Sequence, residues 1–223
     1  KLTPNVTDIV PVAKAAQAGG ADMISAINTI QCLSGIDIDS FEPLPTVAGY
    51  STYGGYSGPA TKPVGLRIVS QIASSVDLPV IGIGGVADFE DAVEYILAGA
   101  SAVQVCTAVM WHGAGIVREM ESGLREYLAR KEMSSPGSLR GLALGKLKAH
   151  QELDRTRRVQ PSLVSPSACT SCGRCVVACR DGGYHALSLH RGRLVIDASR
   201  CDGCSLCAHV CPEGAITMEQ RTG

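Results

Sequence analysis

Long apolar runs, excess basic charge and a dinucleotide-binding fingerprint are all missing from this sequence. No uninterrupted apolar stretch among its 223 residues reaches the roughly 18 residues that suggest a membrane-spanning helix. The formal net charge is -1, so the chain lacks the basic surface typical of nucleic-acid-binding proteins. It also contains no Gly-x-Gly-x-x-Gly motif. These absences favour a soluble protein with no nucleic-acid partner, no membrane partner and no nicotinamide site of its own.

Cysteine is scarce except near the end of the chain. Eight of the ten cysteines lie between Cys169 and Cys211, and only Cys32 and Cys106 lie elsewhere. Clustering at metal-ligand spacing favours a metal site in the reduced cytoplasm over a set of disulfides. We therefore expect a cytoplasmic protein, and we expect neither Cys32 nor Cys106 to act as a reactive thiol.

Residues 1–131 alternate short apolar runs with amphipathic stretches, which is typical of β/α units with parallel strands. Thr7 and Asp88 are candidate helix N-caps. A long loop, rich in Gly, Pro, Ser and Tyr, is expected from Asn28 to Ser57, and loops of that length are usually functional. The expected elements are strands at 21–26, 79–83 and 102–106, and helices at 7–18, 62–75, 88–99 and 114–130.

The chain begins at Lys1, within what reads as the tail of a further strand. Together with the three expected strands, this makes half of a larger β/α domain, so we expect an N-terminally truncated chain. Residues 132–165 are polar, and we interpret them as a linker with one helix near 142–152. Residues 166–223 then form a second domain.

The cysteines of this second domain form two repeats of Cys-x2-Cys-x2-Cys-x3-Cys. The spacing from Cys169 to Cys201 equals that from Cys179 to Cys211, 32 residues each, which indicates an internal duplication. In bacterial ferredoxins with this spacing, the fourth cysteine of each run ligates the other cluster. The sequence thus predicts two [4Fe-4S] clusters with crossed ligands, listed as Cys169, Cys172, Cys175 and Cys211 for the first and Cys201, Cys204, Cys207 and Cys179 for the second.

Two structural zinc sites are the alternative interpretation of eight cysteines. Zinc ligands usually come as Cys-x2-Cys pairs on separate knuckles, and four cysteines in one run are not that pattern. We therefore favour the iron–sulfur clusters.

Gly84 and Gly85 end one expected strand, and Cys106 and Thr107 end the next. In (βα)8 barrels, the loops after the last two strands commonly bind phosphate through backbone N–H groups. Glycines at strand ends are also common as plain turn residues, so this feature alone leaves both interpretations open.

Five motifs in the first domain resemble the flavin-binding half of dihydropyrimidine dehydrogenases, and in particular the FMN/iron–sulfur subunit of the bacterial NAD-dependent enzymes. They are Lys1-Leu-Thr-Pro-Asn5, Asn28-Thr29, Thr52-Tyr-Gly-Gly-Tyr-Ser-Gly-Pro-Ala60 with Lys62-Pro63, Ile83-Gly-Gly85 and Val103-Gln-Val-Cys-Thr107. The resemblance covers essentially the whole chain, because this family also ends in a two-cluster ferredoxin tail. The wider dihydroorotate dehydrogenase group shares the Ser-Gly-Pro-Ala and Gly-Gly motifs but generally lacks that tail.

The resemblance implies the α/β fold class, namely the C-terminal half of a (βα)8 TIM-type barrel in residues 1–131, followed by an α+β two-cluster ferredoxin domain. It also implies that Lys1 lies at the flavin ring, where a cation stabilises the negative charge of reduced flavin. Asn28 and Thr29 would bind the pyrimidine, whose ring presents adjacent donors and acceptors. The residues implied to hold FMN are Lys1, Gly58, Ile83, Gly84, Gly85, Cys106 and Thr107.

The activity that the resemblance implies is that of an oxidoreductase acting on CH–CH bonds, which reduces uracil or thymine to the 5,6-dihydropyrimidine in pyrimidine catabolism. Electrons would come from NADH through a partner subunit with FAD, in a hetero-oligomer, and would cross the two clusters to FMN. In the family the proton donor is a cysteine in a loop upstream of Lys1, so the catalytic residue is unknown here, and Cys32 does not match its position.

Two other interpretations of the function remain open. A related flavoenzyme would act on another cyclic unsaturated substrate, such as an orotate-like acid. Alternatively, the chain is an electron-transfer protein of ferredoxin type without catalysis of its own.

Overall fold

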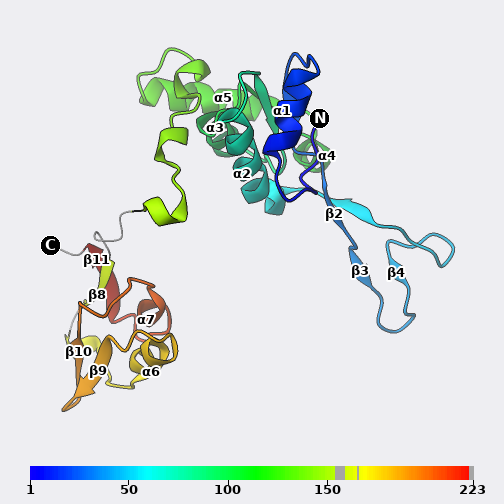
Figure 1. Ribbon diagram of the computed structural model, residues 1–223. Helices are drawn as coiled ribbons and strands as arrows, with labels where there is room; N and C mark the ends of the chain where they lie inside the picture. Colours follow the sequence, from blue (N-terminus) through cyan, green and yellow to red (C-terminus); the bar gives the residue numbers. More distant parts are fainter. Residues whose placement is uncertain (154–158, 165, 221–223) are drawn as a thin grey trace. The chain divides into compact units, whose positions relative to one another are not determined.

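The computed structural model describes residues 1–153, 159–164 and 166–220, and these form two compact units. The first unit covers Lys1–Lys148, and the second covers Ala149–Gly223. Each unit is described separately below (Figure 1).

A parallel sheet forms the centre of the first unit. Its strands are β1 (Ile24–Ala26), β6 (Val80–Ile83) and β7 (Ala102–Gln104), in the order β1-β6-β7. Leu2 extends the sheet beyond β1, because its N–H donates to Ser25 O at 2.8 Å and its carbonyl accepts from Asn28 N–H at 2.8 Å. The strand tail and three parallel strands expected from the sequence are therefore present. The assignment of this sheet to half of a (βα)8 barrel stays a prediction, because three strands and one bridge do not define a closed barrel.

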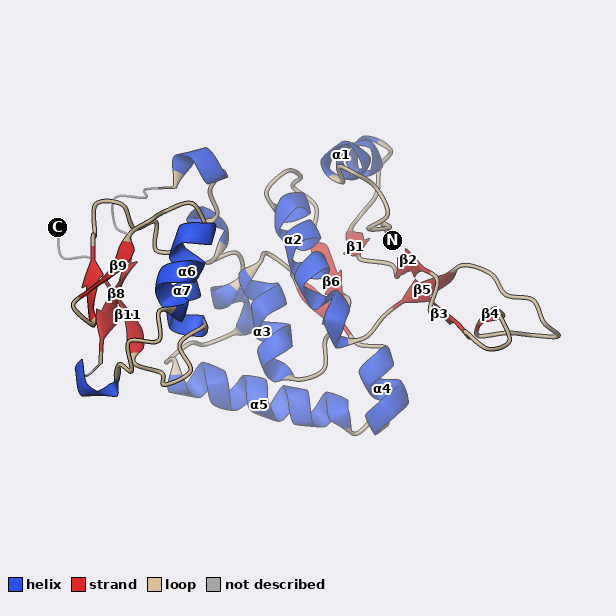
Figure 2. Cartoon of the chain, turned by 90° about the horizontal axis from the view of Figure 1, so that it is seen from below, coloured by secondary structure: helices blue, strands red, loops and turns tan. Residues whose placement is uncertain are grey.

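A helix follows each strand. The helices of this unit are α1 (Val10–Ala18), α2 (Lys62–Ala73), α3 (Phe89–Leu97), α4 (Thr107–His112) and α5 (Ile116–Arg130). Figure 2 shows α3 between α2 and α5, and it packs against both of them. The predicted helix at 114–130 is thus preceded by a separate short helix, α4, that the sequence analysis did not predict; Gly113, at a φ of 79°, ends it.

Asp88 caps α3 as expected, since its Oδ1 accepts from Asp91 N–H at 2.8 Å. The expectation that Thr7 caps the first helix was wrong. The helix begins at Val10, whose N–H donates to Asp8 Oδ1 at 3.0 Å. Pro11 in the first turn explains the later start, because its fixed φ and missing N–H suit only the first positions of a helix.

The core of the first unit lies between the sheet and the helices. Ile24 and Val80 from the strands meet Ile68 and Ile72 from α2, and all four side chains are buried. Tyr95 of α3 is completely buried in the same cluster. Burial of these apolar side chains fixes the helices on the sheet and holds the carboxyl ends of the strands in place.

The segment from Asn28 to Ser57, expected as a loop, contains two antiparallel ribbons. Strand β2 (Ile30–Cys32) pairs with β5 (Gly54–Tyr56), and β3 (Gly35–Ile36) pairs with β4 (Pro43–Leu44). Figure 1 shows β2 and β5 leading away from the helices toward β3 and β4. A short 3-10 helix, η1 (Pro59–Thr61), connects β5 to α2.

The second unit contains two antiparallel strand pairs and two short helices. Strand β8 (Val159–Leu163) pairs with β11 (Ile216–Gln220), and β9 (Leu187–His190) pairs with β10 (Arg193–Ile196). Helix α6 (Arg174–Asp181) follows the first cysteine loop and α7 (Leu206–His209) follows the second, which is the duplication that the spacing predicted.

The predicted linker, residues 132–165, differs from the structure in two ways. Leu139 is buried against Val93, Ile96 and Leu128 of the first unit, and β8 belongs to the second unit. In place of one helix near 142–152 there are two separate 3-10 helices in that stretch. The 3-10 helices beyond α5 are η2 (Pro136–Leu139), η3 (Leu144–Lys146), η4 (His150–Glu152) and η5 (Pro166–Ala168).

None of the helices in the described residues has both the length and the apolar character needed to cross a membrane.

Candidate functional site

A cleft opens at the carboxyl ends of β6 and β7 in the first unit. The structure brings to this cleft every flavin- and pyrimidine-binding residue expected from the sequence, namely Lys1, Asn28, Thr29, Gly58, Ile83, Gly84, Gly85, Cys106 and Thr107. The roles of these residues stay predictions, but their convergence from five separate chain segments is a finding.

Two glycine turns line one wall of the cleft. Gly58, Gly84 and Gly85 have φ values of 91°, 129° and 74°, a region that side chains disfavour. A Cβ atom on Gly85 would lie 2.7 Å from Lys62 N and 2.9 Å from Gly58 O. The backbones of the two turns are therefore in contact. Because these positions have no side chains, a ligand in the cleft can approach the backbone of Gly58, Gly84 and Gly85.

The backbone surface of this wall suits a phosphate-bearing ligand. Among the described residues that line the cleft, Lys1 alone carries a charged side chain. Exposed backbone N–H groups in glycine turns bind anions. The cleft therefore fits FMN, with Gly58, Gly84 and Gly85 as the residues that would hold its phosphate end.

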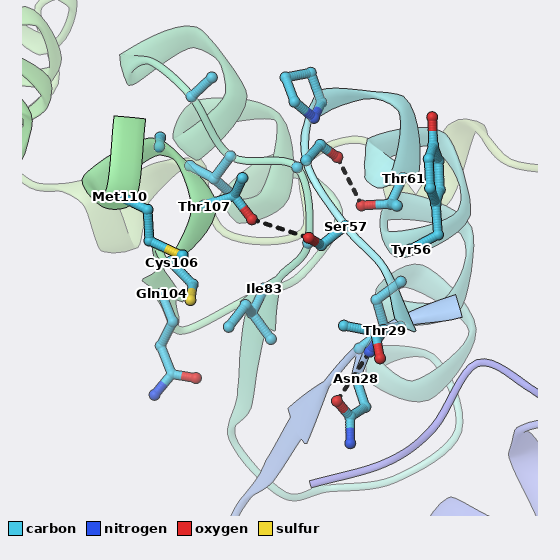
Figure 3. Close-up of a pocket in the computed structure, with 18 of the residues that line it drawn as sticks. Asn28, Thr29, Tyr56, Ser57, Thr61, Ile83, Gln104, Cys106, Thr107 and Met110 are labelled. Carbon is cyan, nitrogen blue, oxygen red and sulfur yellow. Dashed lines mark hydrogen bonds between the residues drawn. The ribbon is translucent and has the colours of Figure 1, made fainter. Parts of the chain in front are cut away.

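Asn28 and Thr29 follow directly after β1. The N–H of Ile27 donates to Ile83 O at 2.7 Å, which ties this turn to the end of β6. The Oδ1 atom of Asn28 accepts from Thr29 N–H at 2.9 Å. Figure 3 shows Asn28 and Thr29 at one side of the cleft, and Gln104, Cys106 and Met110 at the opposite side, with Ile83 between them.

Asn5 holds the Asn28–Thr29 turn from outside the cleft. Its Nδ2 donates to Thr29 O at 3.1 Å, and its Oδ1 accepts from Gln31 N–H at 2.8 Å. The motif Lys1-Leu-Thr-Pro-Asn5 therefore places Lys1 in the cleft and uses its last residue to fix the turn.

Several cleft residues were not singled out by sequence reasoning. Tyr56 and Ser57 come from β5 and the residue after it, and Met110 and Trp111 come from α4. Thr107 Oγ1 donates to Ser57 Oγ at 3.2 Å, so these two segments meet at the cleft. The Ser-Gly-Pro-Ala motif signals Ser57, but no local signal in the sequence points to Trp111, because α4 itself was not predicted.

The second unit divides its eight cysteines into two sets of four. One cavity is lined by Cys169, Cys172, Cys175 and Cys211. Another cavity is lined by Cys179, Cys201, Cys204 and Cys207. These are the two crossed sets that the spacing predicted. In the part of the chain that the structure describes, no three metal-ligating side chains come close enough together to hold a single metal ion. Four thiols around each compact cavity fit a [4Fe-4S] cluster.

Backbone N–H groups donate to the last cysteine of each repeat. Ala186 N–H donates to Cys179 Sγ at 3.2 Å, and Ala215 N–H donates to Cys211 Sγ at 3.3 Å. Hydrogen bonds to the sulfurs are one of the means by which proteins set cluster potentials. Burial raises the pKa of the Cys207 thiol to about 11.

Comparison with known proteins agrees with both parts of this arrangement. A family model described as dihydroorotate dehydrogenase matches residues 1–128, and a model described as a 4Fe-4S dicluster domain matches residues 162–218. The chain belongs to the dihydroorotate dehydrogenase family. It carries the 4Fe-4S dicluster domain in addition, and its cofactors are FMN and [4Fe-4S] clusters, which removes the zinc interpretation.

Two kinds of relative match this dihydroorotate dehydrogenase family member. The NAD-dependent dihydropyrimidine dehydrogenase subunit PreA of Escherichia coli K12 is 41% identical over 229 residues, which cover 98% of the chain and 54% of the relative. The catalytic subunit of dihydroorotate dehydrogenase B (NAD(+)) from Pyrococcus abyssi is 49% identical over 144 residues, or 65% of the chain and 46% of the relative. The corresponding subunit from Alkaliphilus metalliredigens is 51% identical over 141 residues, or 63% and 45%.

The chain spans about half the length of the curated relatives that it matches. These relatives are dehydrogenases by name.

Proposed function

We propose that this chain is part of the FMN/iron–sulfur subunit of an NAD-dependent dihydropyrimidine dehydrogenase, which reduces the 5,6 double bond of uracil or thymine. The observation that carries this proposal is the extent of the match. The PreA relative matches 98% of the chain, whereas the dihydroorotate dehydrogenase B relatives match about two thirds of it. The chain also carries a dihydroorotate dehydrogenase-type domain followed by a 4Fe-4S dicluster domain, and this combination supports the proposed reaction.

Different residues of the cleft would bind the two ends of FMN. Gly58, Gly84 and Gly85 hold the phosphate end, since their backbone leaves room for an anion. Lys1 lies at the ring end, where its charge stabilises electron-rich flavin. The chemistry that FMN supplies when bound is hydride transfer to a ring carbon of the substrate.

Asn28 and Thr29 bind the pyrimidine in this proposal. Because Asn28 Oδ1 accepts from Thr29 N–H, the Nδ2 group is the side of the amide that donates to a ring carbonyl. Asn5 keeps the turn in one position by bonding both Thr29 and Gln31. A ring held in one orientation is what selective attack at one carbon requires.

The two cysteine sets serve as the electron inlet. Electrons from NADH reach them through a partner subunit that contains FAD, so the working enzyme is a hetero-oligomer. The proton donor that completes the reduction is not assigned, and we propose neither Cys32 nor Cys106 for this role. Cys32 lies on β2 outside the cleft, and Cys106 lies at the end of β7 beside Thr107. A cytoplasmic location remains part of the proposal.

A second candidate is oxidation of dihydroorotate or reduction of orotate. The higher identity to the dihydroorotate dehydrogenase B subunits, 47–51% in the examples from Pyrococcus furiosus and Alkaliphilus, favours it. An orotate-like substrate carries a carboxylate, which requires a cation at the substrate end of the cleft. Lys1 is the one charged side chain among the described cleft residues, and the proposal places it at the flavin. An electron-transfer protein without catalysis is disfavoured, because residues 1–128 match a dehydrogenase family.

The experiment that tests the proposal is a steady-state assay of the complete protein with its NADH-oxidising partner. Uracil, thymine and orotate are compared as electron acceptors under anaerobic conditions. The proposal predicts NADH oxidation with uracil or thymine and none with orotate. NADH oxidation with orotate alone would favour the second candidate over the proposal. No NADH oxidation with uracil, thymine or orotate would leave the interpretation as an electron-transfer protein.

A further inference from the structure

A partly buried ion pair links the two glycine turns from behind the cleft. Lys62 is the first residue of α2, just after the Gly58 turn, and Asp91 lies in α3, just after the Gly84–Gly85 turn. Lys62 Nζ lies 2.5 Å from Asp91 Oδ1 and 3.0 Å from Glu94 Oε2. Asp91 is only 6% exposed. The pair is a firm connection between α2 and α3, because parting it would leave the buried carboxylate of Asp91 without its cation.

Helix α3 also holds the Gly84–Gly85 turn at both ends. The second carboxylate oxygen of Asp91, Oδ2, accepts from Ala87 N–H at 2.8 Å. The hydroxyl group of Tyr95 donates to Gly84 O at 2.6 Å, and the Tyr95 side chain is completely buried. The backbone between these two bonds therefore has little freedom to move.

The Gly58 turn is held from the other side. Thr61, which is buried, donates to Gly58 O from its Oγ1 at 2.9 Å and from its N–H at 3.0 Å. Because Gly58 O and Lys62 N lie against Gly85, movement of one turn displaces the other. The Lys62–Asp91 pair sets the separation between them.

We propose that Lys62, Asp91 and Tyr95 are positioning residues for the phosphate of FMN, which they serve by fixing the two glycine turns at the separation that the phosphate requires. This inference rests on the proposed function only in taking the phosphate end of FMN to lie on Gly58, Gly84 and Gly85. Backbone donors bind an anion tightly only when they are held in place beforehand, because reorienting them on binding would cost part of the affinity. None of the three residues is among those that line the cleft, so each acts through the backbone.

The test compares FMN with riboflavin, which has the same ring and ribityl chain and lacks the phosphate. Lys62→Met, Asp91→Asn and Tyr95→Phe are made in the complete protein, and the Kd of each flavin is measured by quenching of flavin fluorescence on the flavin-depleted protein. We expect the Kd of FMN to rise about tenfold in each variant, the equivalent of one strong hydrogen bond, and the Kd of riboflavin to change by less than about twofold. Glu121→Gln is the control, because it removes an exposed ion pair with Arg125 on α5.

Equal losses for both flavins would overturn the inference, because they would show a general disturbance of the cleft. Unchanged FMN affinity would overturn it as well. Tyr95→Phe removes a single hydroxyl group from a buried ring, so it decides the matter if the charge variants do not fold. A wild-type protein that binds neither flavin would instead contradict the flavoenzyme assignment, a result distinct from either of these.

Discussion

Gly55 and Thr29 are packed so closely that a Cβ atom on Gly55 would lie 2.2 Å from Thr29 Oγ1. Thr29 comes just before β2, and Gly55 is the middle residue of β5, which pairs with β2. Only a hydrogen atom fits between them. The β2–β5 ribbon therefore packs directly against Thr29, one of the two residues proposed to bind the pyrimidine. A glycine is needed at position 55 because any side chain there would collide with Thr29.

Replacement of this glycine is expected to impair substrate binding selectively. In Gly55→Ala the added methyl group pushes Thr29 away, and displacement of a substrate-binding group by about 1 Å can cost up to a hundredfold in rate. We expect kcat/KM for uracil to fall at least about tenfold. Gly54→Ala is the matched control, because a Cβ there meets no atom within 4 Å. Equal kinetics for the two variants would contradict this role of Gly55.

Loss of the Asn5 side chain is expected to loosen the same turn. Asn5→Ala removes the bonds to Thr29 O and Gln31 N–H, each worth about 1 kcal/mol. We expect the KM for uracil to rise several-fold while FMN content stays constant. Asn5→Asp retains an acceptor for Gln31 N–H but places an oxygen against Thr29 O, so it should not restore the KM. A wild-type KM in Asn5→Ala would show that the turn needs no such support.

A side chain at Gly85 is expected to abolish FMN binding. In Gly85→Ala the methyl group meets backbone atoms of Lys62 and Gly58, at a φ of 74° that alone costs about 1 kcal/mol. Gly20→Ala has a similar φ of 84° in open space and separates the two effects. FMN content after purification is the measurement. We expect an FMN-free Gly85→Ala and a fully loaded Gly20→Ala; full FMN content in the former would exclude the Gly85 turn from the site.

The crossed cysteine sets predict which double substitutions remove one cluster and which remove two. Cys175→Ser with Cys211→Ser affects a single cavity, so about four irons should remain per chain, the content of one cubane. Cys175→Ser with Cys179→Ser affects both cavities and should leave none, although these two cysteines belong to the same sequence repeat. Iron and acid-labile sulfide analysis gives the counts. The reverse outcome would mean that each repeat binds its own cluster.

The Lys62–Asp91 pair predicts a change of stability at high pH. The hydrogen bond from Asp91 raises the pKa of Lys62 from 10.5 to about 12 in the folded protein. A raised pKa means that folding favours the protonated lysine, so the stabilisation is complete below pH 10.5 and is lost as the pH rises through about 12. The difference in Tm between wild type and Lys62→Met should stay constant from neutral pH to about 10 and then shrink. A constant difference across the whole range would show that the pair contributes nothing.

The β/α order of the first unit was predictable from the sequence because its signals are local. Asp88 caps α3 since a side-chain oxygen can reach the N–H of Asp91, and Gly84–Gly85 ends β6 because the turn there needs positive φ values. The cysteine spacing likewise predicted the two sets of four, since a fixed ligand geometry leaves few alternatives.

The ribbons and β8 could not be predicted, because long-range pairing creates them. Strand β5 contains Gly54 and Gly55, residues that disfavour a strand, and becomes one only through Ile30–Cys32. Strand β8 contains Pro161, which argues against a strand in general but is tolerated in a two-stranded sheet with β11. The Lys62–Asp91 link escaped prediction for the same reason, since nothing local relates two residues on different helices.

The central claim, that the clusters supply electrons to a flavin that reduces a pyrimidine, is tested most directly by one anaerobic experiment. The complete protein is reduced with dithionite, freed of excess reductant and mixed with uracil while the flavin and cluster absorbance are recorded together. The account predicts that both signals return to their oxidised values with uracil and remain reduced with orotate. Reoxidation by orotate but not by uracil, or recovery of neither signal, would contradict it.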